Sequence, residues 1–150
     1  MTKIKETHQV NVIATNRKAR FNYSILETWE TGIKLLGLEV KALRQGNISI
    51  GEAWVKVTDA GVFLVNCSIT PDRVPAWEKY EHRRDRGLLL KKKQIRKLKL
   101  SLQQGQTIIP LKIYFNSKGL AKLEIATAKG KKLHDKRKAL RERDSKRYGF

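Results

Sequence analysis

The sequence predicts a mainly β protein, a small antiparallel barrel with two or three flanking helices and a basic carboxyl-terminal tail. Several short segments alternate apolar and polar residues, as half-buried strands do, and glycine-containing turns separate them at hairpin spacing. The 150 residues, 40% of them hydrophobic, suffice for one domain with a core. Many short strands with glycine punctuation favour a barrel over an open sheet. An oligonucleotide-binding type of barrel fits this pattern, as other small barrels do.

The first long strand and the helix after it are predicted between residues 23 and 44. One parity of the strand is apolar and consists of Tyr23, Ile25, Trp29, Ile33 and Leu35. Gly32 inside the strand predicts a bulge or a sharp bend there. The spacing of Leu38, Ala42 and Leu43 predicts a short helix over residues 37–44, which ends near Gly46.

Two hairpins are predicted further along the chain. Residues 54–58 and 62–69 form the arms of the first, and the loop between them contains Gly61. Residues 107–115 and 120–127 form the second. Pro110 lies inside an arm of the second hairpin, so that arm is expected to be an edge strand or to be bulged at this point.

Between the two hairpins, the spacing of the apolar residues changes from every second residue to the spacing of a helix. A single stripe carries Leu88, Ile95, Leu98 and Leu102, and lysines and arginines occupy the other positions up to Gly105. The pattern predicts a basic amphipathic helix over residues 88–104. Such a helix can lie on a membrane. Its apolar stripe lacks Trp and Phe, however, and we expect it to pack on the barrel with its basic side toward phosphates.

The positive charge is concentrated in two segments. The formal net charge is +19, and residues 83–99 contribute +8 of it while residues 129–150 contribute +7. Two dense runs of one sign are typical of a protein with a polyanionic partner, nucleic acid above all. We therefore expect a body over residues 1–128 and a basic tail over residues 129–150, with nucleic acid or an acidic membrane surface as the partner.

Other classes of function find little support in the sequence. Cys67 is the single cysteine and the three histidines lie far apart, so no metal or cofactor site is expected. No nucleophile motif, phosphate-binding loop or catalytic carboxylate pair is present, and no enzyme is predicted. The chain also lacks a signal-like apolar segment, so we expect a cytoplasmic monomer.

Four of the aromatic residues have two alternative roles, core packing and base stacking. Trp29 and Trp54 are assigned to the core, because Trp29 lies on the apolar parity of its strand. Trp77 and Tyr80 lie in a loop beside basic residues. For these two residues, stacking on RNA and ordinary surface packing remain open.

Four blocks resemble the small protein B family of bacteria, which binds transfer-messenger RNA. They are Asn16-Arg-Lys-Ala19 with Tyr23, the run from Glu30 to Arg44, the run from Leu88 to Ile95, and the run from Ala128 to Arg137. The resemblance implies an oligonucleotide-binding barrel without catalysis. It also implies binding to the tRNA-like domain of that RNA, delivery with GTP-bound elongation factor Tu, and a place in stalled ribosomes at the decoding centre and mRNA channel, against 16S rRNA.

The resemblance also implies roles for individual residues. The expected RNA contacts are Glu30, Arg84, Arg86, Leu90, Lys91, Lys92, Gly130, Lys131 and Lys132. The expected contacts at the decoding site are His134, Asp135, Lys136 and Arg137. In the loop before the three leucines this chain departs from the family pattern, because Gly87 stands where relatives have a lysine.

The tail has too few apolar residues to order itself, since ordering costs about 1–2 kcal/mol per residue. We expect it to be disordered in the free protein. From Leu133 onward it contains no proline, and its only glycine is Gly149. It is therefore expected to become helical when the phosphates of an empty mRNA channel neutralise its charge.

Overall fold

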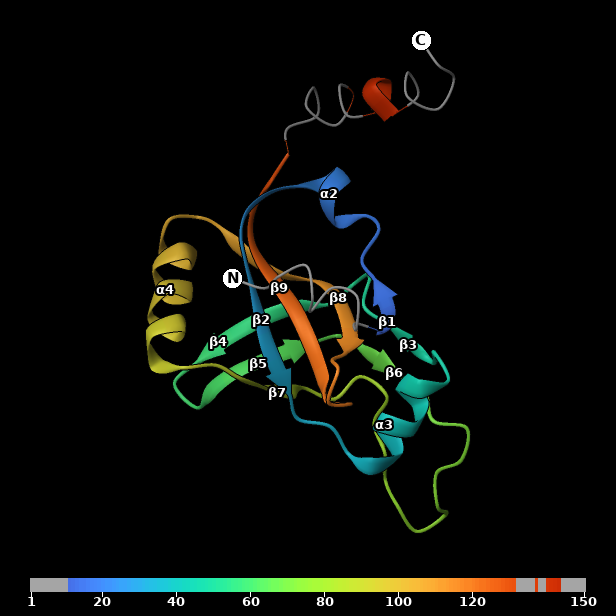
Figure 1. Ribbon diagram of the computed structural model, residues 1–150. Helices are drawn as coiled ribbons and strands as arrows, with labels where there is room; N and C mark the ends of the chain where they lie inside the picture. Colours follow the sequence, from blue (N-terminus) through green and yellow to red (C-terminus); the bar gives the residue numbers. More distant parts are fainter. Residues whose placement is uncertain (1–10, 132–136, 138–139, 144–150) are drawn as a thin grey trace.

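The computed structural model describes residues 11–131, 137 and 140–143 (Figure 1). Its elements are β1 (Asn11–Thr15), α2 (Ala19–Asn22), β2 (Tyr23–Ile33), α3 (Gly37–Arg44), β3 (Ile48–Ser49), β4 (Trp54–Thr58), β5 (Gly61–Val65), β6 (Ser68–Ile69), β7 (Arg86–Leu89), α4 (Lys92–Gln103), β8 (Thr107–Phe115) and β9 (Ala121–Gly130). The predicted mainly β architecture with few helices is confirmed.

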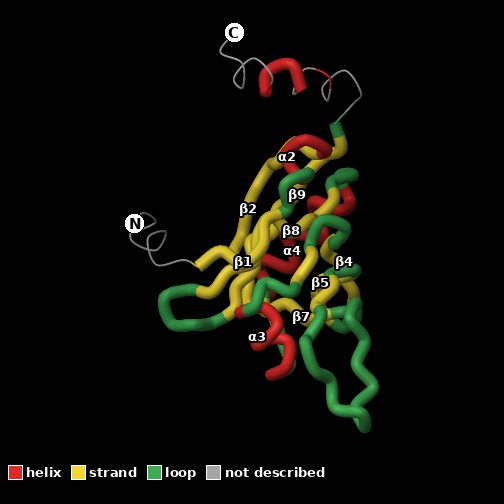
Figure 2. Tube along the Cα trace, turned by 90° about the vertical axis from the view of Figure 1, so that its right-hand side faces the viewer, coloured by secondary structure: helices red, strands yellow, loops and turns green. Residues whose placement is uncertain are grey.

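The described strands form one seven-stranded sheet, in the order β1-β8-β9-β2-β7-β5-β4, and a small β3-β6 ribbon. Neighbouring strands of both sheets run antiparallel. The large sheet curls until β4 comes close to β8. The side chains on the inner face of the curled sheet therefore pack into one core. Figure 2 shows α2 at one end of the curled sheet, with α3 and the long 70–85 loop at the other.

Both predicted hairpins are present, but the arm predicted over residues 62–69 is divided: β5 ends at Val65, and Ser68–Ile69 form β6, which pairs with β3. β4 pairs with β5, with Thr58 opposite Gly61, and β8 pairs with β9 along its whole length. Pro110 lies on β8, which has partners on both sides, and the register shifts between Pro110 and Lys112. Both alternatives for this proline are observed: β1 pairs with β8 only from Lys112 to Phe115, so in the described sheet Pro110 has a strand partner on the β9 side alone, and a bulge follows it.

The prediction of a bulge at Gly32 was wrong. The irregularity of β2 lies between Ile25 and Glu27 instead. Gly32 is the position at which β2 pairs with both neighbours, Lys122 of β9 and Leu89 of β7. A Cβ atom at Gly32 would come within 3.0 Å of Leu89 Cδ1, so the absence of a side chain permits the close approach of β7.

The basic helix is shorter than predicted. Leu88 lies on β7, where it pairs with Ile33 and is buried, and α4 begins only at Lys92. The Gln94 side chain accepts a hydrogen bond from the Lys91 N–H at 2.9 Å and so closes the first turn. Periodicity alone could not separate this short buried strand from a helix.

The core lies inside the curled sheet. Its fully buried members include Leu43 from α3, Leu64 from β5, and four residues of β8 and β9, namely Ile108, Ile113, Leu123 and Ile125. Leu98 of α4 is 1% exposed, so this helix covers the core as predicted. Trp29 packs against the core. The prediction that Trp54 is a core residue was wrong, because its side chain remains 44% exposed.

A buried carboxylate joins α3 to the 70–85 loop and β7. Glu39 is fully buried and forms ion pairs with both Arg84 and Arg86. The Tyr80 hydroxyl donates to Glu39 Oε2 at 3.0 Å, and the Leu36 N–H donates to Oε1 at 2.8 Å. Burial raises the pKa of the Glu39 carboxyl, but hydrogen bonds from Arg84, Leu36 and Arg86 outweigh that effect and hold the pKa below 4.5.

We predict that Glu39→Gln destabilises the fold by about 3–5 kcal/mol, because the buried Arg86 loses its counter-charge. The pKa of Glu39 is lower in the folded chain than its ordinary value of 4.5. Its stabilising effect is therefore complete above that value and is lost as the pH falls through the folded-state pKa. Thermal unfolding between pH 3 and 7 measures both effects, with Glu81→Gln in the same loop as the control. Equal melting temperatures for the two variants at pH 7 would contradict the prediction.

Candidate nucleic-acid interface

Glu30 lies exposed on β2, opposite Glu124 of β9. The Tyr114 hydroxyl, from β8, donates a hydrogen bond to Glu30 Oε2. Tyr114 itself is 5% exposed, so a buried ring holds the carboxylate at the surface of the sheet. Among the described residues Glu30 has no cationic partner, and the ordinary explanation of a surface ion pair does not apply to it.

Leu90 and Lys91 lie where β7 leads into α4. The Thr31 hydroxyl donates to Leu89 O at 3.1 Å, and Gly32 pairs with Leu89. Leu90 packs against the core, whereas Lys91 and Lys92 are exposed. The pairing of β2 with β7 brings the segment that carries Lys91 and Lys92 toward the end of β2 that carries Glu30, and Leu90 anchors that segment.

Gly130 and Lys131 lie at the opposite end of β2. Gly130 pairs with Tyr23, and the Lys131 N–H donates to Asn22 O at 2.9 Å. Tyr23 and Glu30 are seven residues apart, which is about 23 Å along a strand. The residues expected to bind RNA therefore form two groups, one at each end of β2.

Basic residues from two distant segments meet around Lys131. We call this region the cationic end, and its members are Arg17, Lys18, Arg20, Lys129 and Lys131. The sequence shows the first three only as a short basic stretch, for which no role was predicted. Antiparallel pairing of β2 with β9 places that stretch beside the start of the tail (Figure 1).

The outer side of α4 adds a second basic surface. Its exposed cations are Lys92, Lys93, Arg96, Lys97 and Lys99. Because Leu98 faces the core, this basic helix face points to solvent, as predicted. Such an arrangement attracts phosphates without reading sequence.

The prediction that Arg86 contacts RNA was wrong. Its side chain is fully buried and donates to Glu39, to the Tyr80 hydroxyl, and to the carbonyl oxygens of Cys67 and His82. Arg84 binds the same carboxylate and keeps 29% of its side chain exposed. Nothing in the local sequence around Arg84 and Arg86 indicated that their partner is Glu39, a buried acid far away in the chain.

For Tyr80 and Trp77 the sequence left two roles open, stacking on RNA and ordinary packing, and the structure treats the two residues differently. The Tyr80 hydroxyl lies within hydrogen-bond distance of two acceptors, Glu39 Oε2 and Ile69 O, and accepts from Arg86, so its place is in the buried network. Trp77 is 83% exposed, and stacking on a base stays open for it.

The described part of the chain offers few groups for metal binding or nucleophilic chemistry. No group of three or more His, Cys, Asp and Glu side chains comes together there in a metal-binding arrangement. Burial raises the pKa of the Cys67 thiol to about 11, which makes it a poor nucleophile. In the same ranges, none of the helices combines the length and the apolar character that crossing a bilayer demands.

Several residues predicted for the tail fall outside the described residues, namely Lys132, His134, Asp135 and Lys136. Arg137 and residues 140–143 are described; they are helical and exposed.

The fold and this surface define a small basic β protein of the nucleic-acid-binding class. The family model described as SmpB protein matches residues 13–149. The SsrA-binding protein of Allorhizobium ampelinum is 50% identical over 135 residues, which cover 89% of this chain and 85% of the relative. The SsrA-binding protein of Afipia carboxidovorans is 49% identical over 142 residues, covering 93% and 90%. The chain belongs to the SmpB protein family.

A solved structure supports the same family. A chain described under "tmRNA-SmpB: a journey to the center of the bacterial ribosome" is 40% identical and superposes with a TM-score of 0.68. The match covers 85% of this chain and 94% of that one.

We predict that removing two lysines of the cationic end, in Lys18→Ala/Lys131→Ala, lowers RNA affinity at every sequence tested. It should also reduce the slope of log affinity against log salt by about 1.4–1.8, because each phosphate contact contributes ~0.7–0.9. Filter binding of a structured RNA between 50 and 300 mM KCl measures the slope. Lys118→Ala, in the exposed β8–β9 turn, is the control. An unchanged slope in the double variant would show that this end does not touch phosphates.

Proposed function

We propose that this protein binds the tRNA-like domain of transfer-messenger RNA and brings that RNA to stalled ribosomes in trans-translation. The observation that carries the proposal is the match to a tmRNA–SmpB chain on the bacterial ribosome, at 40% identity over 85% of this chain. The two basic surfaces of the fold supply the electrostatic attraction that an RNA partner requires. The role needs no catalytic group, and GTP-bound elongation factor Tu joins through the RNA.

In this proposal the body, predicted as residues 1–128 and extended by β9 to Gly130, holds the RNA along β2. Glu30 reads the RNA by accepting hydrogen bonds from base or sugar donors, since a carboxylate can only repel phosphates. Lys91 and Lys92 bind phosphates beside it, and Gly130 with Lys131 and Lys132 binds them at the other end. The length of β2 between the two groups suits a folded RNA better than a few flexible nucleotides.

The tail, residues 129–150, reports the state of the ribosome. His134, Asp135, Lys136 and Arg137 contact the decoding centre, and the residues beyond them enter the mRNA channel. Because mRNA in the channel excludes the tail, helix formation there signals that the channel is empty. The helical residues 140–143 support a segment able to take that conformation.

Sequencing the RNA that copurifies with the protein tests the proposal. Enrichment of transfer-messenger RNA over ribosomal and transfer RNA is the expected result. Equal affinity for the tRNA-like domain and for a homopolymer of the same length would instead indicate a generic single-strand-binding protein.

We predict that Glu30→Ala weakens binding to the tRNA-like domain by about 10-fold, because losing a hydrogen bond to a charged acceptor costs ~1.5 kcal/mol. Random RNA of equal length should bind equally well or better, since a negative charge is removed. Competition binding with the two RNAs makes the measurement, and Glu124→Ala on the neighbouring strand is the control. Unchanged or improved binding to both RNAs would argue against a specific contact.

We predict that a chain ending at Lys132 keeps its thermal stability and most of its RNA affinity but loses ribosome rescue. The removed segment contributes no residue to the described core. A peptide-tagging assay on ribosomes stalled at the end of a truncated message measures rescue. Tagging at the parental rate would separate the tail from this function.

Leu140→Pro is a milder probe of the same segment. Proline costs ~3 kcal/mol inside a helix and little in an unstructured chain, so we expect tagging to fall while RNA binding is unchanged. Full tagging activity would mean that the tail acts only as a flexible cationic tether.

A further inference from the structure

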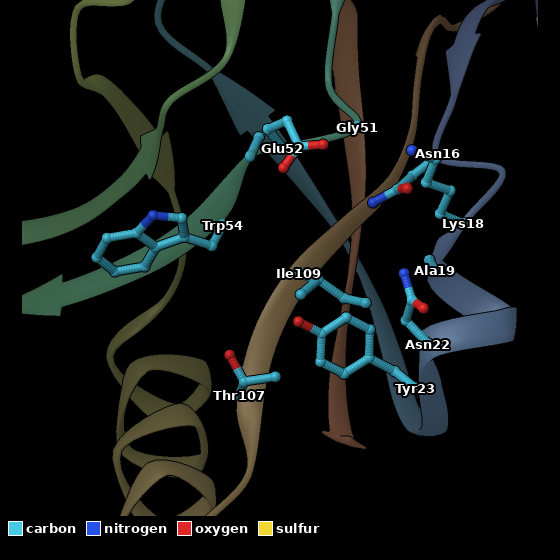
Figure 3. Close-up of a pocket in the computed structure, with 11 residues that line it drawn as sticks. Asn16, Lys18, Ala19, Asn22, Tyr23, Gly51, Glu52, Trp54, Thr107 and Ile109 are labelled. Carbon is cyan, nitrogen blue, oxygen red and sulfur yellow. The ribbon is translucent and has the colours of Figure 1, made fainter. Parts of the chain in front are cut away.

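A cavity of about 270 Å³ opens beside the cationic end, between the α2 segment, the link into β4 and the first residues of β8. The residues that matter for its chemistry are Asn16, Lys18, Tyr23, Glu52, Trp54 and Thr107 (Figure 3). Asn22 also lines it, and Asn22 O accepts from the Lys131 N–H, so the cavity and the cationic end form one continuous surface. Its volume is at the low end for ligand sites, which suits a single ring system.

Trp54 forms one wall of this cavity. The residues on either side of it, Ala53 and Val55, are buried at 6% and 2% exposure, whereas Trp54 is 44% exposed. Side chains alternate along a strand, so the core side of β4 is already filled and the indole faces outward. An outward indole exposes apolar surface and offers a flat π face. Unpaired RNA bases stack on such faces, with ~1–3 kcal/mol for each base.

The opposite wall presents hydrogen-bond acceptors. Asn16 is 8% exposed, and its Nδ2 donates to Pro110 O at 3.0 Å, which fixes the orientation of the amide. Its Oδ1 is buried and has no hydrogen-bond partner within the described residues. A buried acceptor without a partner is costly, so a donor is expected to complete it. Figure 3 shows the Tyr23 hydroxyl directed into the cavity on the side opposite Trp54.

Glu52 gives the cavity an acidic group inside an otherwise cationic surface. A carboxylate repels phosphate, so this position is unsuited to the RNA backbone. It is suited to a base edge that carries N–H donors, where the hydrogen bonds are charge-assisted. Guanine carries two adjacent donors, N1–H and N2–H, whereas uracil carries one. Lys18 at the rim is placed to bind the phosphate of the same nucleotide.

We propose that this cavity binds one unpaired guanine of the RNA partner, stacked on Trp54 with its donor edge toward Glu52 and Asn16. The site rests on the proposed RNA-binding function and adds a sequence-reading position to it. Phosphate contacts at the cationic end carry no sequence information, whereas a base held by acceptors does.

The first experiment measures the affinity of the full-length protein for the tRNA-like domain of transfer-messenger RNA. Trp54→Ala should weaken binding by about 5-fold or more, as the loss of one stacked base predicts, and Trp54→Phe should restore most of it. Leu120→Ala is the control, since Leu120 is an apolar side chain of similar exposure, 55%, that lies outside the cavity. Melting temperatures of the variants show whether the fold is intact.

The outcomes separate this site from the function on which it rests. If the parent protein fails to bind the RNA, the proposed function is overturned and the site with it. If the parent binds and a folded Trp54→Ala binds equally well, the site alone is overturned.

The second experiment identifies the ligand with the probes GMP, UMP and inorganic phosphate. In ¹H–¹⁵N spectra, GMP should shift the Trp54 indole and Asn16 side-chain resonances more than UMP does, and phosphate alone should leave them unchanged. Glu52→Gln should reduce the preference for GMP without moving the melting temperature. Equal shifts with all three probes would mean that only electrostatic attraction operates there, and the guanine assignment would be wrong.

Discussion

The buried ion pair between Glu39 and Arg86 is the constraint on which the rest of the structure depends. Removing a carboxylate and a guanidinium from water costs free energy, and the cost is offset only when every hydrogen-bonding position of both groups has a partner. The chain meets this condition with donors from α3, from the 70–85 loop and from β7. Arg86 opens β7, so the network fixes the strand that carries Leu88 and Leu90 toward the basic helix.

β2 connects the two surfaces that the proposed function uses. Its first residues pair with the end of β9 and form the cationic end, and its last residues pair with β7 beside Lys91. One strand therefore sets the spacing between the two groups of side chains that are proposed to bind RNA. The bulge between Ile25 and Glu27 and the close approach at Gly32 adapt that strand to its two neighbours.

The charge distribution and the fold perform different tasks. The exposed lysines of α4 and of the cationic end provide attraction that any RNA can use, because phosphates are alike along every sequence. Selectivity must come from groups that accept or stack, and these are few: Glu30 on β2, and Trp54 with the acceptors around it. Glu30 is supported by a buried neighbour, Tyr114, whose hydroxyl donates a hydrogen bond to its carboxylate.

Local patterns in the sequence determined most of the secondary structure and the class of partner. Alternation with glycine turns predicted both hairpins, and Pro110 marked a position where the ladder is irregular. Clustered lysines predicted the basic helix face and a polyanionic partner. These features depend on neighbours within a few residues of one another, so a single sequence contains the information. The family resemblance added residue roles that no spacing could supply.

Only the tertiary structure decided which polar and aromatic residues are free to act. Arg86 looked like a further RNA-binding cation, but its partner Glu39 is 47 residues away and buried. Trp54 looked like a core residue until the burial of Ala53 and Val55 turned it outward. The Arg17–Arg20 stretch forms part of a basic surface only because β2 and β9 place it beside Lys131. In each case the deciding contact joins distant segments, and burial, which sets the cost of a charge or a ring, exists only in the folded chain.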